Sequence, residues 1–307
     1  MSTDQVKNLE ASVRDRLLQV SKKRNEDYHF VLSRYANERF LYRLYKSNYK
    51  DHFILKGAML FMVWTSELYR PTKDVDLLGF GDNSDDALRT KFQEICKVTV
   101  EPDGLTFDDK DIRIMEIREE QDYHGQRILM TANIGKTKIP MQFDVGFGDV
   151  VTDPPEIDFP TLLDFPAPKI RAYPKESVVS EKLQIIVEFG IASSRMKDYY
   201  DLSVIAKQFD FQGTLLVEAI RRTFRKRNTE IPQKKPIGLS QDFIADDNKQ
   251  KQWKAFISKN NVHHISESLA KIADFLCEFL LPPLEAANDN SKTWNYFWKN
   301  GGPWEKE

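Results

Sequence analysis

The segment Leu55–Phe80 reads LKGAMLFMVWTSELYRPTKDVDLLGF and contains the features that decide the fold. A turn at Gly57 is followed by an apolar run, a polar loop, and an apolar segment that holds Asp74 and Asp76. Because successive side chains of a strand point to opposite faces, the two aspartates share one face and the residue between them faces the core. Paired carboxylates on one face suit Mg²⁺, which keeps water and substrate phosphates as its other ligands. We therefore expect a metal and nucleotide site here, although a solvated strand end with two surface aspartates has the same pattern.

The order strand, glycine turn, helix strengthens this expectation. The residues Phe53–Leu55 predict a strand, and a helix that starts after Gly57 would direct backbone N–H groups at phosphates. Glycine lets the backbone approach a phosphate that a side chain would block, unless it is only an ordinary turn residue. Lys56 either contacts phosphate or covers the edge of the sheet. Three more polar residues lie in the loop before the aspartates: Arg70, Thr72 and Lys73. The cations of this loop would attract a triphosphate, and its threonine either hydrogen-bonds a carboxylate or shapes the turn.

Composition limits the class of protein. The chain has 307 residues, of which 41% are apolar and 30% are charged, and this suits one large or two modest domains. Its 45 basic and 47 acidic residues give a net charge of −2, so any RNA contact needs a local basic patch. Cys96 and Cys277 form no CxxC pair, which argues against a zinc site or a disulfide framework. No apolar run reaches the ~18 residues of a membrane span, and we expect a cytoplasmic protein without a membrane partner.

The pattern of periodicities predicts an α/β (α+β) protein with a mixed β-sheet flanked by helices. Segments with apolar residues at helical spacing are 4–21, 26–49, 58–67, 85–98, 176–189, 214–227, 241–259 and 266–281. Segments that predict strands are 53–55, 105–107, 112–117, 127–134 and 139–145. Six of the 14 prolines lie within 153–174, which predicts an extended linker. We expect a core domain over 1–160 and a mostly helical domain over 161–307 that completes the active-site cleft.

A third carboxylate is expected on a later strand. Asp144 lies between two apolar residues in the predicted strand 139–145, where a lone carboxylate is costly without a partner. If this strand lies beside the one that carries Asp74 and Asp76, the three aspartates form one cluster. Asp149 is the rival candidate, and its position after Gly-Phe-Gly favours a turn residue.

Two predicted helices in the second half of the chain carry charged residues in positions that need an explanation. Lys182 lies on the apolar stripe of the helix 176–189. Either its stem is buried with the ammonium group at the surface, or the ammonium group points into an anionic cleft. Arg195, Asp198 and Asp201 are spaced by three and share one face of the next helix. An ion-pair ladder without further function would give the same spacing.

A basic run ends the predicted helix 214–227. It consists of Arg221, Arg222, Arg225, Lys226 and Arg227. Cations at a helix C-terminus are favoured by the macrodipole, by about 0.3–1 kcal/mol each, so the run needs no function. It is nevertheless the best candidate in the sequence for an RNA-backbone contact.

Four short motifs occur in a fixed order: Lys56-Gly57, Arg70–Asp76 (RPTKDVD), Glu181-Lys182-Leu183 and Arg195–Asp201 (RMKDYYD). Together they resemble the AbiEii/AbiGii-type, or MenT-like, nucleotidyltransferase toxin family of the polymerase-β-like superfamily. The resemblance covers Phe53 to Asp201 by motif. This chain has Gly-Ala-Met at the turn where many members of the superfamily have Gly-Ser or Gly-Gly-Thr, so no hydroxyl is available there for a phosphate. Arg195 also stands one place earlier than the family spacing.

The resemblance implies a nucleotidyltransferase core that uses Mg²⁺ or Mn²⁺ and an NTP substrate. Asp74 and Asp76 would bind the metal, and Asp144 would join them and help to deprotonate the attacking hydroxyl. Lys182 would serve the triphosphate, and Asp198 would organise the nucleotide pocket with it. The roles implied for the remaining motif residues are nucleotide contact by Arg195 and a structural role for Asp201, which would hold Arg195 or Lys197.

The resemblance also implies a toxin that transfers NMP to RNA, specifically the 3′ end of tRNA, and arrests growth under the control of an antitoxin encoded alongside. One rival is a protein nucleotidylyltransferase or kinase-like enzyme that modifies a side-chain hydroxyl. A second rival is a catalytically silent module that binds a nucleotide or RNA. The presence of all five candidate catalytic residues argues against this second rival.

Overall fold

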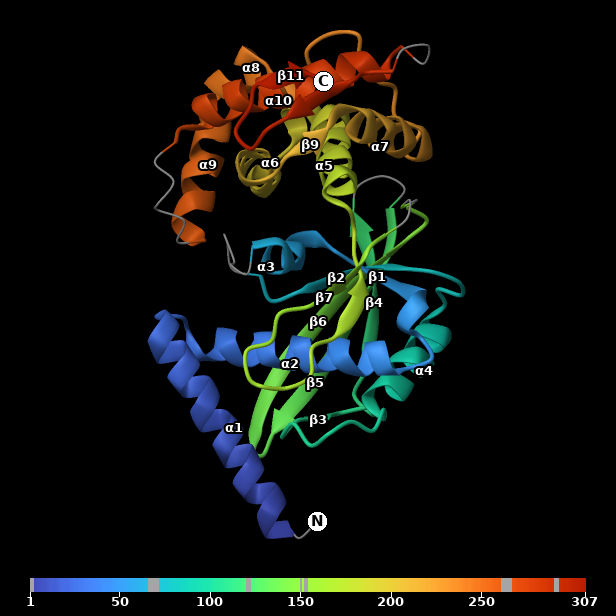
Figure 1. Ribbon diagram of the computed structural model, residues 1–307, viewed down its shortest axis with the longest axis vertical. Coiled ribbons are helices and arrows are strands. Elements are labelled where there is room, and N and C mark those ends of the chain that lie inside the picture. The colour runs from blue at the N-terminus through green and yellow to red at the C-terminus, as the bar shows by residue number, and fades with distance from the viewer. Residues whose placement is uncertain are drawn as a thin grey trace. The chain divides into compact units, whose positions relative to one another are not determined.

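The computed structural model describes residues 3–65, 72–119, 123–149, 151, 154–260, 267–289 and 293–307. The chain forms two compact units. The first unit comprises residues 1–149 and 153–173, and the second comprises 150–152 and 174–307 (Figure 1). Each unit is described by itself.

A six-stranded mixed sheet forms the centre of the first unit. Its strands are β1 (Phe53–Lys56), β2 (Val75–Gly79), β3 (Thr106–Phe107), β4 (Arg113–Glu119), β5 (Tyr123–Ile134) and β6 (Thr137–Phe147). The order is β1-β2-β6-β5-β3, and β4 also pairs with β5. The strands β2 and β6 run parallel, whereas the other pairs are antiparallel. This mixed sheet with its helices confirms the expected fold class.

Helices cover the sheet of the first unit. They are α1 (Thr3–Arg24), α2 (Tyr28–Lys46), α3 (Leu60–Thr65) and α4 (Asp85–Cys96), with short 3₁₀ turns at Lys50–His52 and Gly57–Met59. Side-chain caps begin two of them: Asp27 accepts a hydrogen bond from the Phe30 N–H at 2.9 Å, and Ser84 starts α4 in the same way. Helix α2 crosses β6 (Figure 1), and the rings of Phe40 and Phe143 lie 4.4 Å apart at this crossing. Phe92 of α4 joins them, so these three rings form the centre of the core.

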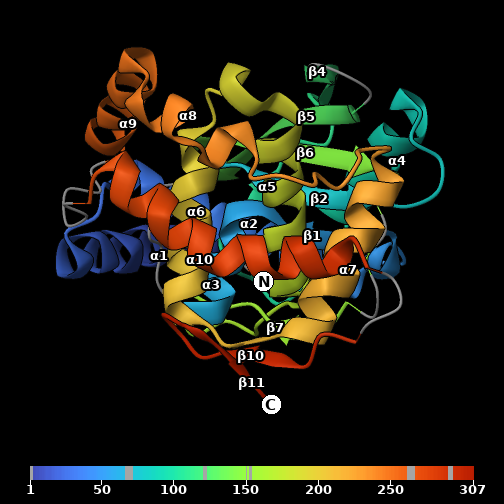
Figure 2. The ribbon, with the colours of Figure 1, turned by 90° about the horizontal axis from the view of Figure 1, so that it is seen from above.

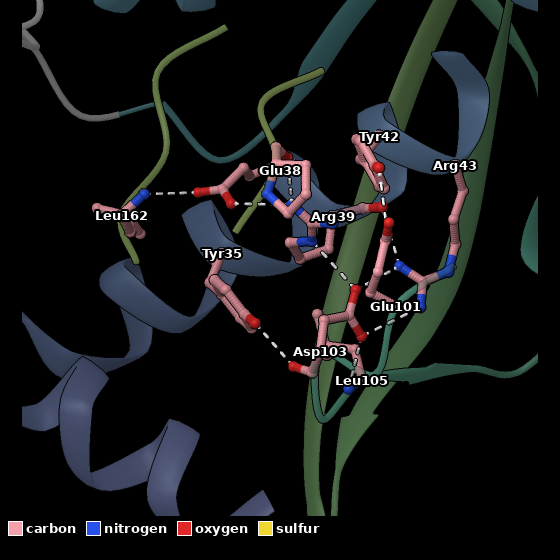
Figure 3. A network of polar contacts seen from close by, with 10 residues as sticks. Tyr35, Glu38, Arg39, Tyr42, Arg43, Glu101, Asp103, Leu105 and Leu162 are labelled. Atoms are coloured by element: carbon pink, nitrogen blue, oxygen red, sulfur yellow. Dashed lines mark hydrogen bonds and ion pairs between the residues drawn. The ribbon is translucent and has the colours of Figure 1, made fainter. Parts of the chain in front are cut away.

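A network of buried charges ties α2 to the loop before β3 (Figure 3). Asp103 is 1% exposed and binds two arginines of α2. The Arg39 Nε lies 3.1 Å and the Arg43 Nη1 2.7 Å from its Oδ2 atom. Tyr35 donates to the Asp103 carbonyl at 2.7 Å. Burying these charges is tolerable because each is paired and hydrogen-bonded.

Glu38, the one acidic residue of α2, has a buried carboxyl that is only partly compensated. Its Oε2 accepts a hydrogen bond from the Leu162 N–H at 2.7 Å. The Arg39 Nη1 lies 3.6 Å from Oε1, which is close enough for an ion pair but too long for a hydrogen bond. Oε1 accordingly has no hydrogen-bond partner. Burial raises the pKa of Glu38 to about 7, because the Leu162 hydrogen bond and the Arg39 charge offset only part of the desolvation.

This raised pKa predicts a pH-dependent stability of the first unit. The folded state holds the Glu38 proton more tightly than the unfolded state, so its contribution is fully present below pH 4.5 and is lost as the pH rises to about 7. The shift corresponds to a loss on the order of 3 kcal/mol. Glu38→Gln keeps the acceptor for the Leu162 N–H and should abolish this loss of stability with rising pH. The measurement is the free energy of unfolding in urea at about pH 5 and about pH 8, with pulse proteolysis at sites within α2 to report on the first unit. Asp164→Asn, which neutralises a fully exposed carboxylate, serves as the control and should lose as much stability between the two pH values as the wild type does. An equally large loss in Glu38→Gln would show that Glu38 is not the cause of the pH dependence.

The proline-rich segment differs from the expected linker. It contains the two-stranded sheet β7 (Glu156–Asp158) and β8 (Lys169–Arg171), and it belongs to the first unit as far as Tyr173. Ala172 forms a parallel bridge with Leu55 of β1, and the Pro166 carbonyl accepts a hydrogen bond from Arg39 at 2.8 Å. These contacts place the end of the unit beyond the boundary expected at residue 160, because prolines lack only the donor and still pair through their carbonyls.

The second unit is mostly helical, as expected. Its helices are α5 (Lys175–Phe189), α6 (Met196–Gln208), α7 (Gly213–Lys226), α8 (Gln241–Ala245), α9 (Asp247–Lys259) and α10 (Leu269–Ala287). Short 3₁₀ turns lie at Gly190–Ala192 and Ile237–Leu239, and a small sheet joins β9 (Phe211–Gln212), β10 (Tyr296–Trp298) and β11 (Trp304–Lys306). Helix α10 lies across α6 and α7 (Figure 2). None of the helices in the described ranges has the length and apolarity that crossing a membrane requires.

Helix α10 continues through Pro282 and Pro283, although the sequence predicts its end at Leu281. A proline removes the N–H that would bond to the carbonyl four residues earlier. For Pro283 that carbonyl belongs to Phe279, and it accepts a hydrogen bond from the Trp304 Nε1 at 2.9 Å. Trp304 therefore packs on α10, with its ring stacked on that of Phe279.

Candidate active site

The two aspartates of the quoted segment lie at the beginning of β2. Asp74 directly precedes the strand and Asp76 is its second residue. Both are partly exposed, whereas Val75 and Leu77 are buried. The alternation expected from the sequence is therefore confirmed: the two carboxylates share the face of the sheet that is not filled by the core.

Four strands each contribute one charged residue to a line across this face, which we call the charged row. Lys56 of β1 lies directly opposite Asp76 of β2, Asp76 opposite Asp144 of β6, and Asp144 opposite Arg127 of β5. Directly opposite residues share a face, so the row has the order plus, minus, minus, plus. Two adjacent carboxylates repel each other, and a cation at either end of the row reduces that cost.

Asp144 therefore lies beside Asp76, as the three-aspartate hypothesis requires, but it is bound to Arg127. The Arg127 Nε and Nη2 lie 2.8 Å from the two carboxylate oxygens, a bidentate geometry, and the Gln142 amide adds a contact at 3.2 Å. Within the described ranges, no three carboxylate, histidine or cysteine side chains are grouped so that they could hold a metal ion. A ligand role for Asp144 thus stays a prediction.

Asp149, the rival third carboxylate, has a different contact. Its Oδ2 lies 3.2 Å from the Lys56 Nζ, and both side chains are mostly buried. The Lys56 ammonium also lies 5.4 Å from the centre of the Tyr173 ring. Asp149 therefore compensates the lysine at one end of the charged row.

Gly57 adopts a conformation that favours glycine, with φ of +72°, and lies against Asp76. A Cβ atom at this position would come 1.9 Å from the Asp76 Oδ2 and 2.5 Å from its Cγ. Phosphate approach at this glycine stays a prediction, beside the alternative of an ordinary turn residue. The structure supplies an additional reason, because the Asp76 carboxylate occupies the space that any side chain would need.

The loop before β2 is held from α2. The Nδ2 of Asn37 donates a hydrogen bond to the Lys73 carbonyl at 2.9 Å. The side chain of Lys73 is exposed and that of Thr72 is partly exposed, while Arg70 lies outside the described residues. Nucleotide contact by these three residues stays a prediction.

Sequence reasoning missed three polar residues around the aspartates: Asn37, Arg127 and Gln142. Gln142 lies between two apolar residues of its strand, so a local signal for a polar face was present there, whereas Arg127 follows the polar Gln126 and gives no such alternation. Their pairing with Asp144 depends on strand register, which one sequence does not specify. Asn37 lies on the buried side of a helix, and its role depends on a loop far away in the chain.

The donor chemistry of β2 fits a divalent cation such as Mg²⁺ or Mn²⁺. Asp74 and Asp76 offer carboxylate oxygens two residues apart on one face, and Gly57 leaves room for the Asp76 carboxylate. Mg²⁺ is usually bound through one or two carboxylates together with substrate phosphates, so two protein ligands suffice.

The second unit contains a buried cluster of alternating charges. The Lys182 Nζ of α5 lies 2.6 Å from the Asp198 Oδ1 and 2.9 Å from the Asp201 Oδ2, both on α6. The Arg195 Nε lies 2.8 Å from the other Asp198 oxygen. Both aspartates are 1% exposed. Burial raises the pKa of the Asp198 carboxyl, but the charges of Lys182 and Arg195 lower it more, so its pKa lies below the ordinary value. The structure thus brings Lys182 and Asp198 into contact, while their role in nucleotide binding stays a prediction.

Lys182→Met should destabilise the second unit by about 3 kcal/mol, because two buried aspartates lose an ammonium partner. The matched control is Lys207→Met, since Lys207 forms a half-exposed ion pair with Glu267 on the same unit. Loss of this ion pair should lower the free energy of unfolding by less than ~1 kcal/mol. Urea unfolding followed by tryptophan fluorescence measures both, because four of the five tryptophans belong to this unit. Equal losses for the two variants would contradict a special role of the buried cluster.

The basic run at the end of α7 is partly occupied by structural contacts. Arg221 donates to the carbonyls of Ala286, Ala287 and Asp289 at the end of α10. Arg222 pairs with Glu218, and Arg227 pairs with Glu181. The exposed cations Arg225 and Lys226 are the members best placed for a phosphate backbone. RNA binding by the run stays a prediction.

Paired aspartates on a mixed sheet, beside a glycine turn, are compatible with metal-assisted transfer of a phosphate-containing group. The chain belongs to the AbiEii nucleotidyl transferase toxin family of type IV toxin–antitoxin systems, whose family profile matches residues 39–275. The match includes α2 from Arg39 on, the charged row and the Lys182 cluster. Membership establishes the class of enzyme and implies an NTP substrate and an antitoxin partner.

Comparison with solved structures gives weaker likenesses. The crystal structure of JHP933 from Helicobacter pylori is 14% identical, with a TM-score of 0.45, and the match covers 81% of this chain and 86% of that one. A second H. pylori protein, described as a candidate nucleotidyltransferase, gives the same identity and TM-score. That match covers 81% of this chain and 88% of the other. Scores at this level support no inference about function. No curated protein sequence matches the chain significantly.

Proposed function

We propose that the protein transfers a nucleoside monophosphate from an NTP to RNA, at the 3′ end of tRNA, with Mg²⁺ or Mn²⁺ as cofactor. The observation that supports this proposal most is the placement of Asp74 and Asp76 at the start of β2, with Asp144 directly opposite Asp76. Family membership supplies nucleotidyl transfer and the NTP. The metal and the acceptor are part of our proposal.

The proposed reaction is an in-line displacement at the α-phosphorus. The acceptor hydroxyl oxygen forms a bond to this phosphorus, and the bond from the phosphorus to the bridging oxygen of the β-phosphate breaks. Pyrophosphate leaves with the electron pair of that bond, and the hydroxyl proton passes to Asp144. A divalent cation held by Asp74 and Asp76 would supply charge neutralisation and alignment of the triphosphate. The chain itself contributes positioning and fixed charges.

In the first unit, we propose nucleotide contact by Lys56, Gly57, Arg70, Thr72 and Lys73. In the second unit, taken by itself, the residues with a proposed affinity for a triphosphate are Lys182, Arg195 and Asp198. Asp198 holds both cations of its cluster within 2.8 Å, so it fixes their orientation. Arg195 is 28% exposed and is the member of this cluster most accessible to an anion.

The proposed setting is a cytoplasm that provides NTP, Mg²⁺ and RNA together. The net charge of −2 gives no general attraction to RNA, so we assign backbone contact to Arg225 and Lys226, with the other three cations of the run nearby in sequence. Loss of acceptor RNA function would arrest growth, and the antitoxin implied by the family would prevent this.

The test combines purified protein, Mg²⁺, each α-labelled NTP in turn and total tRNA. Label is expected in RNA for at least one NTP, should disappear with a chelator and should return with added Mg²⁺ or Mn²⁺. Label on protein bands alone would contradict the RNA acceptor and indicate a protein nucleotidylyltransferase. Measurable NTP binding without any labelled product would indicate a silent binding module.

A further inference from the structure

Three consecutive polar residues in the middle of α2 are buried, and each reaches a different loop. Asn37, Glu38 and Arg39 are each at most 1% exposed. Glu38 accepts a hydrogen bond from Leu162, and Arg39 binds Asp103. Asn37 reaches the loop that leads into the aspartates, so its contact is the one of the three that bears on the site.

The Asn37 amide makes one hydrogen bond and leaves one atom without a partner. Its Nδ2 donates to the Lys73 carbonyl at 2.9 Å, and its Oδ1 is buried with no hydrogen-bond partner. The reverse orientation of the amide would place two carbonyl oxygens face to face, so this assignment of the donor follows from chemistry. A buried polar atom without a partner costs stability, and an apolar residue of the same size would avoid that cost. The asparagine therefore makes its one hydrogen bond at the expense of a partnerless oxygen, and what that hydrogen bond holds is the Lys73 carbonyl.

That carbonyl is covalently linked to the first predicted metal ligand. The carbonyl carbon of Lys73 is bonded to the Asp74 nitrogen through a planar peptide group, so holding the oxygen also holds the start of Asp74. One turn further along α2, Phe40 packs on Phe143 of β6 at 4.4 Å, directly before Asp144. The same helix thus sets the position of the entry to β2 and the position of β6.

We propose that Asn37 is a positioning residue that fixes Asp74, and through it the divalent cation site at the start of β2. The inference rests on the proposed function, which supplies a divalent cation as the ligand of Asp74. It concerns a residue that lies before the part of the chain matched by the family profile.

The decisive variant is Asn37→Leu, which has nearly the same size and removes both the donor and the partnerless oxygen. The matched control is Tyr35→Phe on the same helix, because Tyr35 also donates from a buried side chain to a loop carbonyl, that of Asp103, at 2.7 Å. Mn²⁺ binding to the protein without NTP is measured by electron paramagnetic resonance, together with thermal unfolding and hydrogen exchange of the amides of residues 74–77. Transfer assays then separate kcat from the KM for the metal–NTP complex.

Asn37→Leu should weaken Mn²⁺ binding roughly 10- to 100-fold and speed exchange at Asp74 and Val75, with a loss of stability no greater than that of Tyr35→Phe. Tyr35→Phe should lower stability and leave Mn²⁺ affinity unchanged. Unchanged Mn²⁺ affinity in Asn37→Leu, or an equal loss in Tyr35→Phe, would overturn the proposal, and so would a wild type that binds no Mn²⁺. A wild type that binds Mn²⁺ but transfers no NMP would defeat the proposed function alone, since the binding comparison still decides the role of Asn37.

Discussion

The Asp76→Asn variant is expected to lose NMP transfer by on the order of 10³-fold while it stays folded. Asp76 occupies the centre of the charged row, between Lys56 and Asp144, and lies against Gly57. Asparagine keeps the shape but removes the charge that a divalent cation requires. It also relieves repulsion from Asp144, so the thermal midpoint without Mg²⁺ should not fall.

Thermal unfolding with and without metal and nucleotide supplies a second measurement for this variant. A ligand at 100 times its Kd stabilises a folded protein by about 2.7 kcal/mol, and this gain should be absent in Asp76→Asn. Asp158→Asn, which changes an exposed carboxylate on β7, is the matched control and should behave as the wild type. Transfer within tenfold of the wild-type rate would remove Asp76 from the metal site.

Gly57→Ala should reduce transfer by more than ~100-fold, although the substitution adds only a methyl group. Its Cβ would lie 1.9 Å from the Asp76 Oδ2, so either the carboxylate or the β1 turn has to move. The positive φ of +72° adds backbone strain of roughly 1–2 kcal/mol. We therefore expect lower stability together with a loss of activity that exceeds what the unfolded fraction explains.

Gly81→Ala separates these two causes. Gly81 has a φ of +83°, similar to that of Gly57, but a Cβ there meets no atom within 4 Å. It should show the strain alone, with transfer per folded molecule unchanged. Similar transfer rates in the two variants, after correction for the folded fraction, would show that contact with Asp76 is unimportant. The measurement is initial-rate transfer alongside urea unfolding of each variant.

The sequence predicted those parts of the site that depend on local rules. The period of two placed Asp74 and Asp76 on one face, and the apolar neighbours of Asp144 placed it in a strand. The helix 241–259 was predicted as one element, whereas Asp246 caps a new helix and divides it into α8 and α9. The capping aspartate was visible in the sequence, but the break depends on how the second unit packs.

The parts that could not be predicted depend on contacts between distant residues. Arg127 and Asp144 meet because β5 and β6 pair in one register, and a shift by one residue would have placed them on opposite faces. The same holds for Asn37, whose partner lies 36 residues away. The pairing of β7 with β8 is not predicted by the proline content of this segment, because the paired residues 156–158 and 169–171 include no proline.

The charged row has a consequence for when the protein becomes active during synthesis. Its four members come from four strands, and the last of them in the chain, Asp144, follows Asp76 by an entire helix and three strands. A ribosome-bound chain that has emerged only as far as β2 carries both predicted metal ligands but neither their neighbouring carboxylate nor its arginine. On the proposed function, such a nascent fragment lacks two members of the charged row, and we expect no NMP transfer before β6 has joined the sheet.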